Sequence, residues 1–195
     1  MNPIAVIVGK VSKMSAKVGN LRHTRTRKSL IDAFIELASE KDFEKITVLD
    51  LTERASVNRA TFYAHFQDKV DLIDAVISDS ATSMLEKRTE ERVQFNVQFL
   101  QQLVLAVCDY HQHLKGQCKR SYMSIAPLLK EKMLEALQLY LTKSLADIYT
   151  ESERQLYVPI YAAILYEAGH LWGTEQVAYN SRELAERTAK LILPY

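Results

Sequence analysis

The residues best suited to chemistry lie in the segment RATFYAHFQDK, which begins at Arg59. The guanidinium of Arg59 can bond guanine O6 and N7 together, and the methyl group of Thr61 can contact the methyl group of thymine. Tyr63, His65 and Lys69 carry donors that suit phosphate oxygens, which position a protein on DNA without reading its sequence. These residue types predict a surface that binds double-stranded DNA.

Local signals predict that this segment is the second of two short helices. Thr47 can cap the first helix, and the carboxylate of Asp50 favours its positive end. The first pattern breaks at Ser56, and Asn58 is a good N-cap for a helix over 59–66. Two short helices joined by a tight turn form a helix-turn-helix, whose second helix enters the DNA major groove.

The two faces of the second helix differ in chemistry. Phe62 and Phe66 are four residues apart, so they share one face that can be buried. On the other faces, Ala60 and Ala64 are small enough to let the backbone approach base edges. The aromatic residues outside the buried face could also be ordinary half-buried residues, but the caps, the turn and the paired Phe residues together favour DNA binding.

Basic residues cluster just before the first long helix. Such a face suits phosphate binding, although a solvated tail explains the cluster equally well. The whole chain has a formal net charge of only +1, so its overall balance does not indicate nucleic acid. The cluster consists of Arg22, His23, Arg25, Arg27 and Lys28.

Composition indicates a globular, all-α protein. The 195 residues are 48% hydrophobic and 25% charged, with only five Gly and four Pro, and helix-forming Leu, Ala, Glu and Lys are abundant. No apolar run approaches the roughly 18 residues of a membrane span, and no export signal is evident, so we expect a cytoplasmic location and no membrane partner. Gly-rich phosphate loops and common hydrolase motifs are absent from the sequence, which argues against an enzyme.

The segment from Thr24 to about Ile77 resembles the N-terminal domain of the TetR (tetracycline-repressor) family of transcription regulators. The matching stretches are TRKSLIDAF at 26–34, FEKITV at 43–48 and ASVNRATFYAHFxDK at 55–69. The family usually has Gly in the turn, where this chain has Ser56, and a left-handed turn is less comfortable for Ser. The resemblance implies DNA contacts or groove-facing positions at Thr47, Arg59, Ala60, Thr61, Tyr63, Ala64, His65 and Lys69.

Helical periodicity continues to the end of the chain. We expect a disordered or loosely docked extension over 1–22, a helix-turn-helix DNA-binding domain of three helices over 23–77, and a regulatory and dimerisation bundle over 78–195. The expected helices outside the helix-turn-helix cover 25–41, 70–85, 93–114, 122–130, 131–149, 155–173 and 181–193.

The expected helix over 155–173 is apolar nearly all round, so it must be buried on all sides. Burial against a second copy is a natural solution for a chain of this size, and the interior of a monomer is the alternative. The resemblance implies that this helix and the last one pair with their mates in a homodimer. The interface residues would be Tyr157, Ile160, Tyr161, Ile164, Leu165, Ala168 and Leu171.

The resemblance also implies a pocket for a small hydrophobic effector among the middle helices. Each candidate residue could equally be an ordinary core residue, because aromatic and Met side chains at helical spacing fill any bundle core. The candidates are Phe95, Phe99, Leu103, Tyr110, Met123, Met133, Tyr140 and Trp172.

Four potential metal ligands lie within eleven positions: Cys108, His111, His113 and Cys118. Their types could bind zinc or copper, or the two thiols could form a redox pair. The spacing does not match a standard zinc finger or ribbon. We therefore expect no metal or cofactor, with a half-buried Cys108, an exposed histidine pair and a loop Cys118.

The sequence thus predicts a homodimeric transcription regulator that binds a palindromic operator and is released by an effector in its C-terminal domain. Repression is the default behaviour that the resemblance implies. Two alternatives stay open. One is a DNA-bound adaptor of the same fold that recruits a protein partner or activates without a small-molecule inducer, and the other is a metal- or thiol-based sensor.

Overall fold

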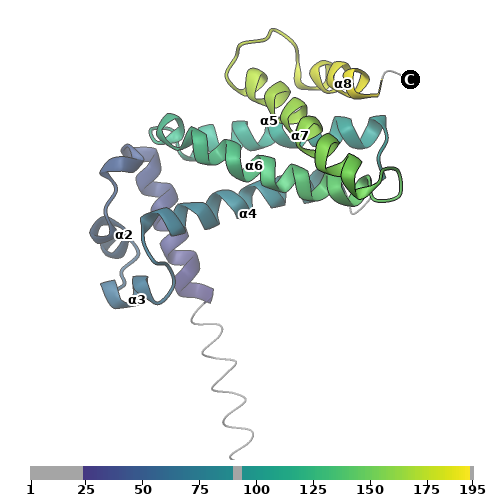
Figure 1. Ribbon diagram of the computed structural model, residues 1–195. Helices are drawn as coiled ribbons and strands as arrows, with labels where there is room; N and C mark the ends of the chain where they lie inside the picture. Colours follow the sequence, from purple (N-terminus) through teal and green to yellow (C-terminus); the bar gives the residue numbers. More distant parts are fainter. Residues whose placement is uncertain (1–23, 90–93, 194–195) are drawn as a thin grey trace, which may run out of the picture.

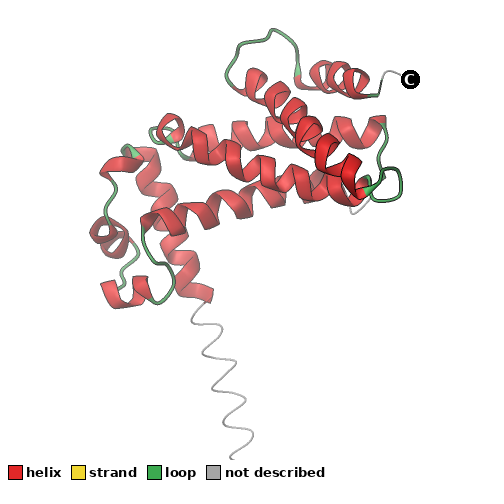
Figure 2. Ribbon diagram, in the orientation of Figure 1, coloured by secondary structure: helices red, strands yellow, loops and turns green. Residues whose placement is uncertain are grey.

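The computed structural model describes residues 24–89 and 94–193, and all regular structure in these ranges is helical (Figure 2). The predicted all-α fold is confirmed. Figure 1 shows a small N-terminal head at one side of a longer helical bundle. The predicted extension over 1–22, with Arg22 and His23, lies outside the described residues.

The head is built from short elements around one apolar core. A helix over 24–40, here called the N-terminal helix, precedes a 3-10 turn, η1, at the connector expected after it. The core buries Leu30, Phe34, Leu51 and Phe62 completely. The remaining elements of the head are η1 (Phe43–Lys45), α2 (Val48–Arg54) and α3 (Arg59–Tyr63).

The bundle consists of α4, α5, α6, α7 and α8, and α4 connects it to the head. α4 begins beside the head and packs along α5 and α6, while α8 lies across α5 and α7 (Figure 1). The predicted division after residue 77 therefore falls inside one continuous helix. The bounds are α4 (Lys69–Thr89), α5 (Val97–Gln117), α6 (Tyr122–Ser144), α7 (Glu151–Gly173) and α8 (Ser181–Ile192).

Several predicted helix limits are wrong. The two helices expected over 122–130 and 131–149 are the single helix α6, because Pro127 lies near its beginning and does not end it. α5 continues through Gly116 to Gln117, beyond the expected end at residue 114. α7 begins at Glu151, four residues before the expected start, because Thr150 and Glu153 form a capping box.

Two glycines allow α7 to lie very close to α5. A Cβ atom at Gly169 would stand 2.5 Å from Val107 Cγ1, and one at Gly173 would stand 2.6 Å from His111 Cβ. Both distances are shorter than any real carbon contact, so the two helices can pack this closely only with glycine at these positions.

Within the described residues, no helix is long and apolar enough to cross a membrane.

Candidate nucleic-acid interface

Side-chain caps fix where α2 and α3 begin. The Thr47 hydroxyl accepts from the amide of Asp50 at 3.1 Å, and the Asp50 carboxylate accepts from the amide of Thr47 at 2.7 Å. Asn58 Oδ1 accepts from the amide of Thr61 at 2.7 Å and from its hydroxyl at 2.8 Å. Both predicted caps are confirmed, and they satisfy amides that the first helical turn leaves unpaired.

The turn between α2 and α3 is left-handed at Ser56, where φ is 54°. The amide of Ser56 donates to the carbonyl of Glu53 at 3.1 Å, and the amide of Val57 donates to that of Thr52 at 2.9 Å. This pair of bonds is a Schellman motif, in which glycine is the usual left-handed residue. The departure from the glycine pattern therefore falls at the one turn position where it is costly.

α3 is buried on one side and open on the other. Phe62 is fully buried and Phe66 is 4% exposed, as predicted, whereas Tyr63 is 52% exposed. The helix is shorter than expected, because it ends at Tyr63 and a turn carries the chain to Phe66. Arg59, Ala60 and Ala64 are exposed, and Thr61 and His65 are partly buried. Thus Arg59, Ala60, Tyr63 and Ala64 are the accessible candidates, and the specific DNA contacts stay a prediction.

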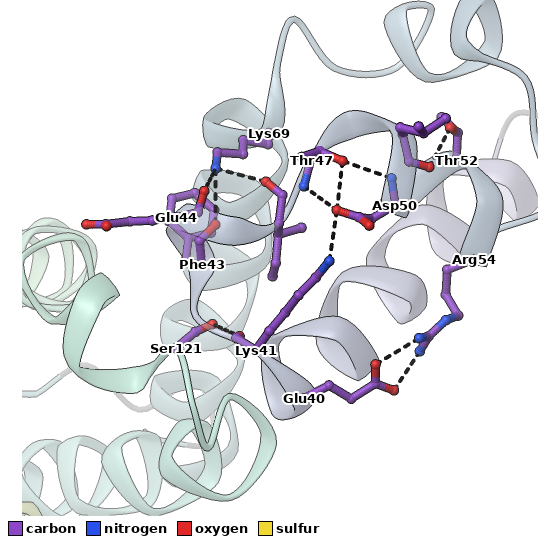
Figure 3. Close-up of polar contacts among 12 residues, drawn as sticks. Glu40, Lys41, Phe43, Glu44, Thr47, Asp50, Thr52, Arg54, Lys69 and Ser121 are labelled. Carbon is purple, nitrogen blue, oxygen red and sulfur yellow. Dashed lines mark hydrogen bonds and ion pairs between the residues drawn. The ribbon is translucent and has the colours of Figure 1, made fainter.

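Lys69 has a different role from the predicted phosphate contact. Its ammonium donates to the backbone carbonyls of Phe43, Glu44 and Ile46 at 3.1, 3.0 and 2.9 Å (Figure 3). It also lies 4.7 Å from the centroid of the Phe43 ring. An ammonium has three N–H donors, so a phosphate would have to displace one of these carbonyls. Lys69 instead joins the first residue of α4 to the connector before α2.

Two ion pairs hold α2 against the preceding segment. The Lys41 ammonium lies 2.9 Å from the Asp50 carboxylate (Figure 3), and this contact, together with the bonds from Thr47, lowers the pKa of Asp50 to about 2. Arg54 bonds both carboxylate oxygens of Glu40 at 2.9 Å. The charged forms of Asp50 and Glu40 are therefore the ones that hold α2 against the N-terminal helix and the residue that follows it.

The described part of the basic cluster has two kinds of member. Arg25 and Lys28 are exposed near the start of the N-terminal helix. Arg27 lies 3.5 Å from Asp79 of α4 and stacks over the Phe66 ring at 5.5 Å from its centroid. Arg25 and Lys28 are therefore better placed for phosphate than Arg27, whose guanidinium joins the head to α4.

The predicted effector residues do not gather in one pocket. Leu103, Tyr110 and Met133 are fully buried in the core. An open groove of about 1190 Å³ is bordered by α5, α6, α7 and the loop after α7. Of the predicted set, only Met123 and Trp172 line this groove. The other three predicted residues lie elsewhere. The Phe95 ring stacks on Tyr161, and Tyr140 is half-buried. Phe99 is 5% exposed and borders a smaller polar cavity.

The predicted dimer residues of α7 also divide. Leu165 is fully buried inside the protomer, so it cannot contact a second copy in this arrangement. Ile160 is 46% exposed, and the neighbouring Leu156, which the sequence argument omitted, is 58% exposed. The other predicted residues, Tyr157, Tyr161, Ile164, Ala168 and Leu171, are partly buried. Hence α7 has an apolar outer side, although a narrower one than predicted.

The Cys and His set forms no metal site. Within the described residues, no group of three or more candidate ligands is placed to hold a metal ion. Cys108 is buried in α5, not half-buried as expected. Cys118 lies in the turn after α5, as expected, and is also buried. Burial raises the pKa of the two thiols to about 12 and about 11. His111 was expected to be exposed but is 1% exposed, and its Nδ1 lies 2.7 Å from the Tyr122 hydroxyl.

Comparison with known sequences finds a family model that matches the head and the start of α4. The family model for bacterial regulatory proteins of the tetR family matches residues 30–76. The HTH-type transcriptional regulator YxbF of Bacillus subtilis (strain 168) is 36% identical over 69 residues, which are 35% of this chain and 18% of that protein. The matched segments span between 18% and 36% of the lengths of the curated relatives.

Comparison with solved structures covers most of the chain. A TetR transcriptional regulator from Streptococcus agalactiae 2603V has a TM-score of 0.59 at 20% identity, over 91% of this chain and 98% of that one. The regulator FadR from Bacillus subtilis, solved in complex with stearoyl-CoA, has a TM-score of 0.52 at 19% identity, over 85% and 96% of the two chains. At these identities the likeness establishes the fold, head and bundle together.

Proposed function

We propose that this chain, which belongs to the tetR family of bacterial regulatory proteins, binds a specific palindromic DNA sequence as a homodimer and represses transcription until an effector releases it. The observation that carries the proposal is the accessible side of α3. Arg59, Ala60 and Tyr63 are exposed there, while Phe62 anchors the opposite side in the core of the head. A recognition helix needs this combination of a fixed inner face and a free outer one.

Selection of bound duplexes from a random DNA pool tests the proposal. We expect a palindrome whose half-sites are about one helical turn apart, because a two-fold dimer presents two copies of α3. Recovery of no preferred sequence at low salt would refute specific binding.

Two variants separate base reading from phosphate binding. Arg59→Ala should relax the preference at one base position in each half-site, at a cost of about 1–3 kcal/mol for the correct base. Lys28→Ala should weaken binding to all duplexes similarly and reduce the salt slope by about 0.9. If Arg59→Ala leaves the selected sequence unchanged, Arg59 does not read a base.

The proposed dimer uses the outer side of α7 together with α8. Leu156 and Ile160 of α7 are exposed one turn apart, and Leu191 of α8 is 72% exposed. A double variant, Leu156→Asp with Ile160→Asp, should convert the protein to a monomer, because it places two charges in an apolar interface. Leu139→Asp is the matched control, since Leu139 is an equally exposed leucine (54%) on α6. Light scattering that shows the same mass for both variants would exclude this interface.

An effector pocket fits the structure better than a pure adaptor role. An adaptor that recruits a protein partner would have no need for a cavity, whereas the bundle has an open groove of about 1190 Å³. The similar FadR structure contains stearoyl-CoA, which supports the proposal that a bundle of this fold accommodates a small molecule. Release of DNA by an effector requires that the effector bind one arrangement of the two heads more tightly than the other.

A further inference from the structure

We propose that the groove between α5, α6 and α7 is the effector site and that it binds an apolar organic acid, whose carboxylate is held by Lys115 and Lys119. The inference rests on the proposed function, since it names the class of molecule that would act on the DNA-binding head. It follows from three features of the groove: its apolar floor, the charges at its rim and its contact with the head.

The floor of the groove is apolar and partly aromatic. Tyr122 and Ala126 of α6, Trp172 of α7 and Val177 of the following loop line it. Met123, also in the lining, is 76% exposed. An exposed methionine in the same groove as a tryptophan presents unusual apolar surface to solvent, and an apolar molecule in the groove would cover it.

The charges at the rim favour an anion. Two lysines, Lys115 and Lys119, line the groove, and Glu175 is the only acidic residue among the lining residues. The Lys115 ammonium lies 2.7 Å from the Glu175 carboxylate and 3.4 Å from the carbonyl of Gly173. Thus the ammonium of Lys115 is already paired with the carboxylate of Glu175. The ammonium of Lys119 is exposed, and the carboxylate of a ligand in the groove would reach it.

Glu175 is held in a strained conformation beside this ion pair. Its φ is 60°, a left-handed value. This conformation is unfavourable for any residue that has a Cβ atom. The amides of Glu175 and Gln176 donate to the carbonyls of Trp172 and Leu171 at 3.0 and 2.9 Å, which makes a second Schellman motif. A ligand carboxylate that took the place of Glu175 on Lys115 would free the loop after α7 from one of its contacts.

The same end of the groove touches the DNA-binding head. Tyr122 lines the groove, and the hydroxyl of the adjacent Ser121 donates to the carbonyl of Lys41 at 2.9 Å. The side chain of Lys41 in turn contacts Asp50, which caps α2 together with Thr47 (Figure 3). A chain of four residues, Tyr122, Ser121, Lys41 and Asp50, therefore connects the groove wall to the start of α2. A shift of the first turn of α6 would act directly on the head through this chain.

The binding experiment uses Trp172, the only tryptophan in the chain, as an internal reporter. Full-length protein is titrated with phenylbutyrate, phenylbutanol and phenylbutylamine, which share an apolar body and differ in charge. We expect phenylbutyrate to change the Trp172 emission at the lowest concentration and the amine at the highest. Equal affinity for all three probes, or no change with phenylbutyrate, would overturn the inference.

Three variants locate the binding site. The double variant Lys115→Gln with Lys119→Gln should raise the Kd for phenylbutyrate about tenfold, as expected when charge-assisted contacts are lost, and should leave the Kd for phenylbutanol unchanged. Gly116→Phe should block the groove, because a Cβ at Gly116 meets nothing within 4 Å and the residue lines the groove. Lys143→Gln on α6 removes an exposed charge away from the groove and from the proposed dimer surface, and it is the control. Wild-type affinity in both groove variants would overturn the inference.

A DNA-binding measurement keeps this inference separable from the proposed function. With the selected duplex, phenylbutyrate should lower the affinity of the wild-type protein. Ser121→Ala should bind phenylbutyrate normally but show a smaller loss of DNA affinity, since the link to Lys41 is gone. If the protein binds its duplex but phenylbutyrate binds without lowering DNA affinity, the groove is not the effector site and the proposed function stands. If no duplex is bound, the proposed function itself fails.

Discussion

Replacement of Lys69 by methionine separates a structural lysine from a DNA-contacting one. The change keeps most of the apolar stem and removes the ammonium that donates to the carbonyls of Phe43, Glu44 and Ile46. Hydrogen bonds from a charged group contribute roughly 1.5–3 kcal/mol each. The contact to the Glu44 carbonyl is exposed and contributes little, so the two part-buried contacts, to the carbonyls of Phe43 and Ile46, contribute about 3 kcal/mol together at the lower end of that range. We therefore expect Lys69→Met to lower the free energy of unfolding by about 2–4 kcal/mol.

Urea unfolding at a fixed protomer concentration measures this loss. With a slope of roughly 2 kcal/mol per molar urea, the middle of the usual range, the midpoint should fall by about 1–2 M. The slope of DNA affinity against salt should not change, because no phosphate contact is lost. Lys28→Met is the comparison, and it should leave the urea midpoint unchanged while reducing the salt slope by about 0.9. An unchanged midpoint for Lys69→Met, together with a reduced salt slope, would refute the structural role.

Three further predictions concern the turn, the glycines and a buried histidine. Ser56→Gly should stabilise the protein by about 0.5–1 kcal/mol in urea unfolding, since it relieves the left-handed φ of 54°; a lower midpoint would contradict this. Gly116→Ala should raise stability by about 0.5–1 kcal/mol, whereas Gly173→Ala should lower it by about 1–3 kcal/mol, because its Cβ would lie 2.6 Å from His111 Cβ. Burial lowers the pKa of His111 to about 4, so the unfolded chain binds its proton at higher pH than the folded one. Stability should then fall by up to about 3 kcal/mol as the pH drops from 7 to 4, and His111→Gln should remove most of this dependence in thermal or urea unfolding.

The head was largely predictable because its signals are local. Thr47 and Asn58 announce helix starts by their residue types, and Phe62 and Phe66 share a face at helical spacing, so each inference needed only neighbouring residues. The structure confirms these caps and this buried face. The carbonyl partners of Lys69 were not predictable, because they lie more than twenty residues away and a sequence does not show which distant carbonyls an ammonium will meet.

The bundle was less predictable because its faces depend on packing between helices. Leu165 and Ile160 are both apolar residues of α7, yet one is fully buried and the other is 46% exposed. The packing of α5, α6 and α8 against α7 decides between them, and the close approach of α5 depends on Gly169 and Gly173. The same geometry brings Met123 and Trp172 to one groove and sends Tyr110 into the core.

α4 has a mechanical consequence for the spacing of the two heads. It is one unbroken helix of 21 residues that begins at the head and ends within the bundle, so it behaves as a lever about 30 Å long. A tilt of about 5° at the bundle end of such a rod moves the other end by nearly 3 Å, close to the rise of one base pair. In a dimer the α4 helices of both protomers would move. A change in the bundle too small to disturb its core would then be enough to change the distance between the two copies of α3, so that they no longer match successive major grooves.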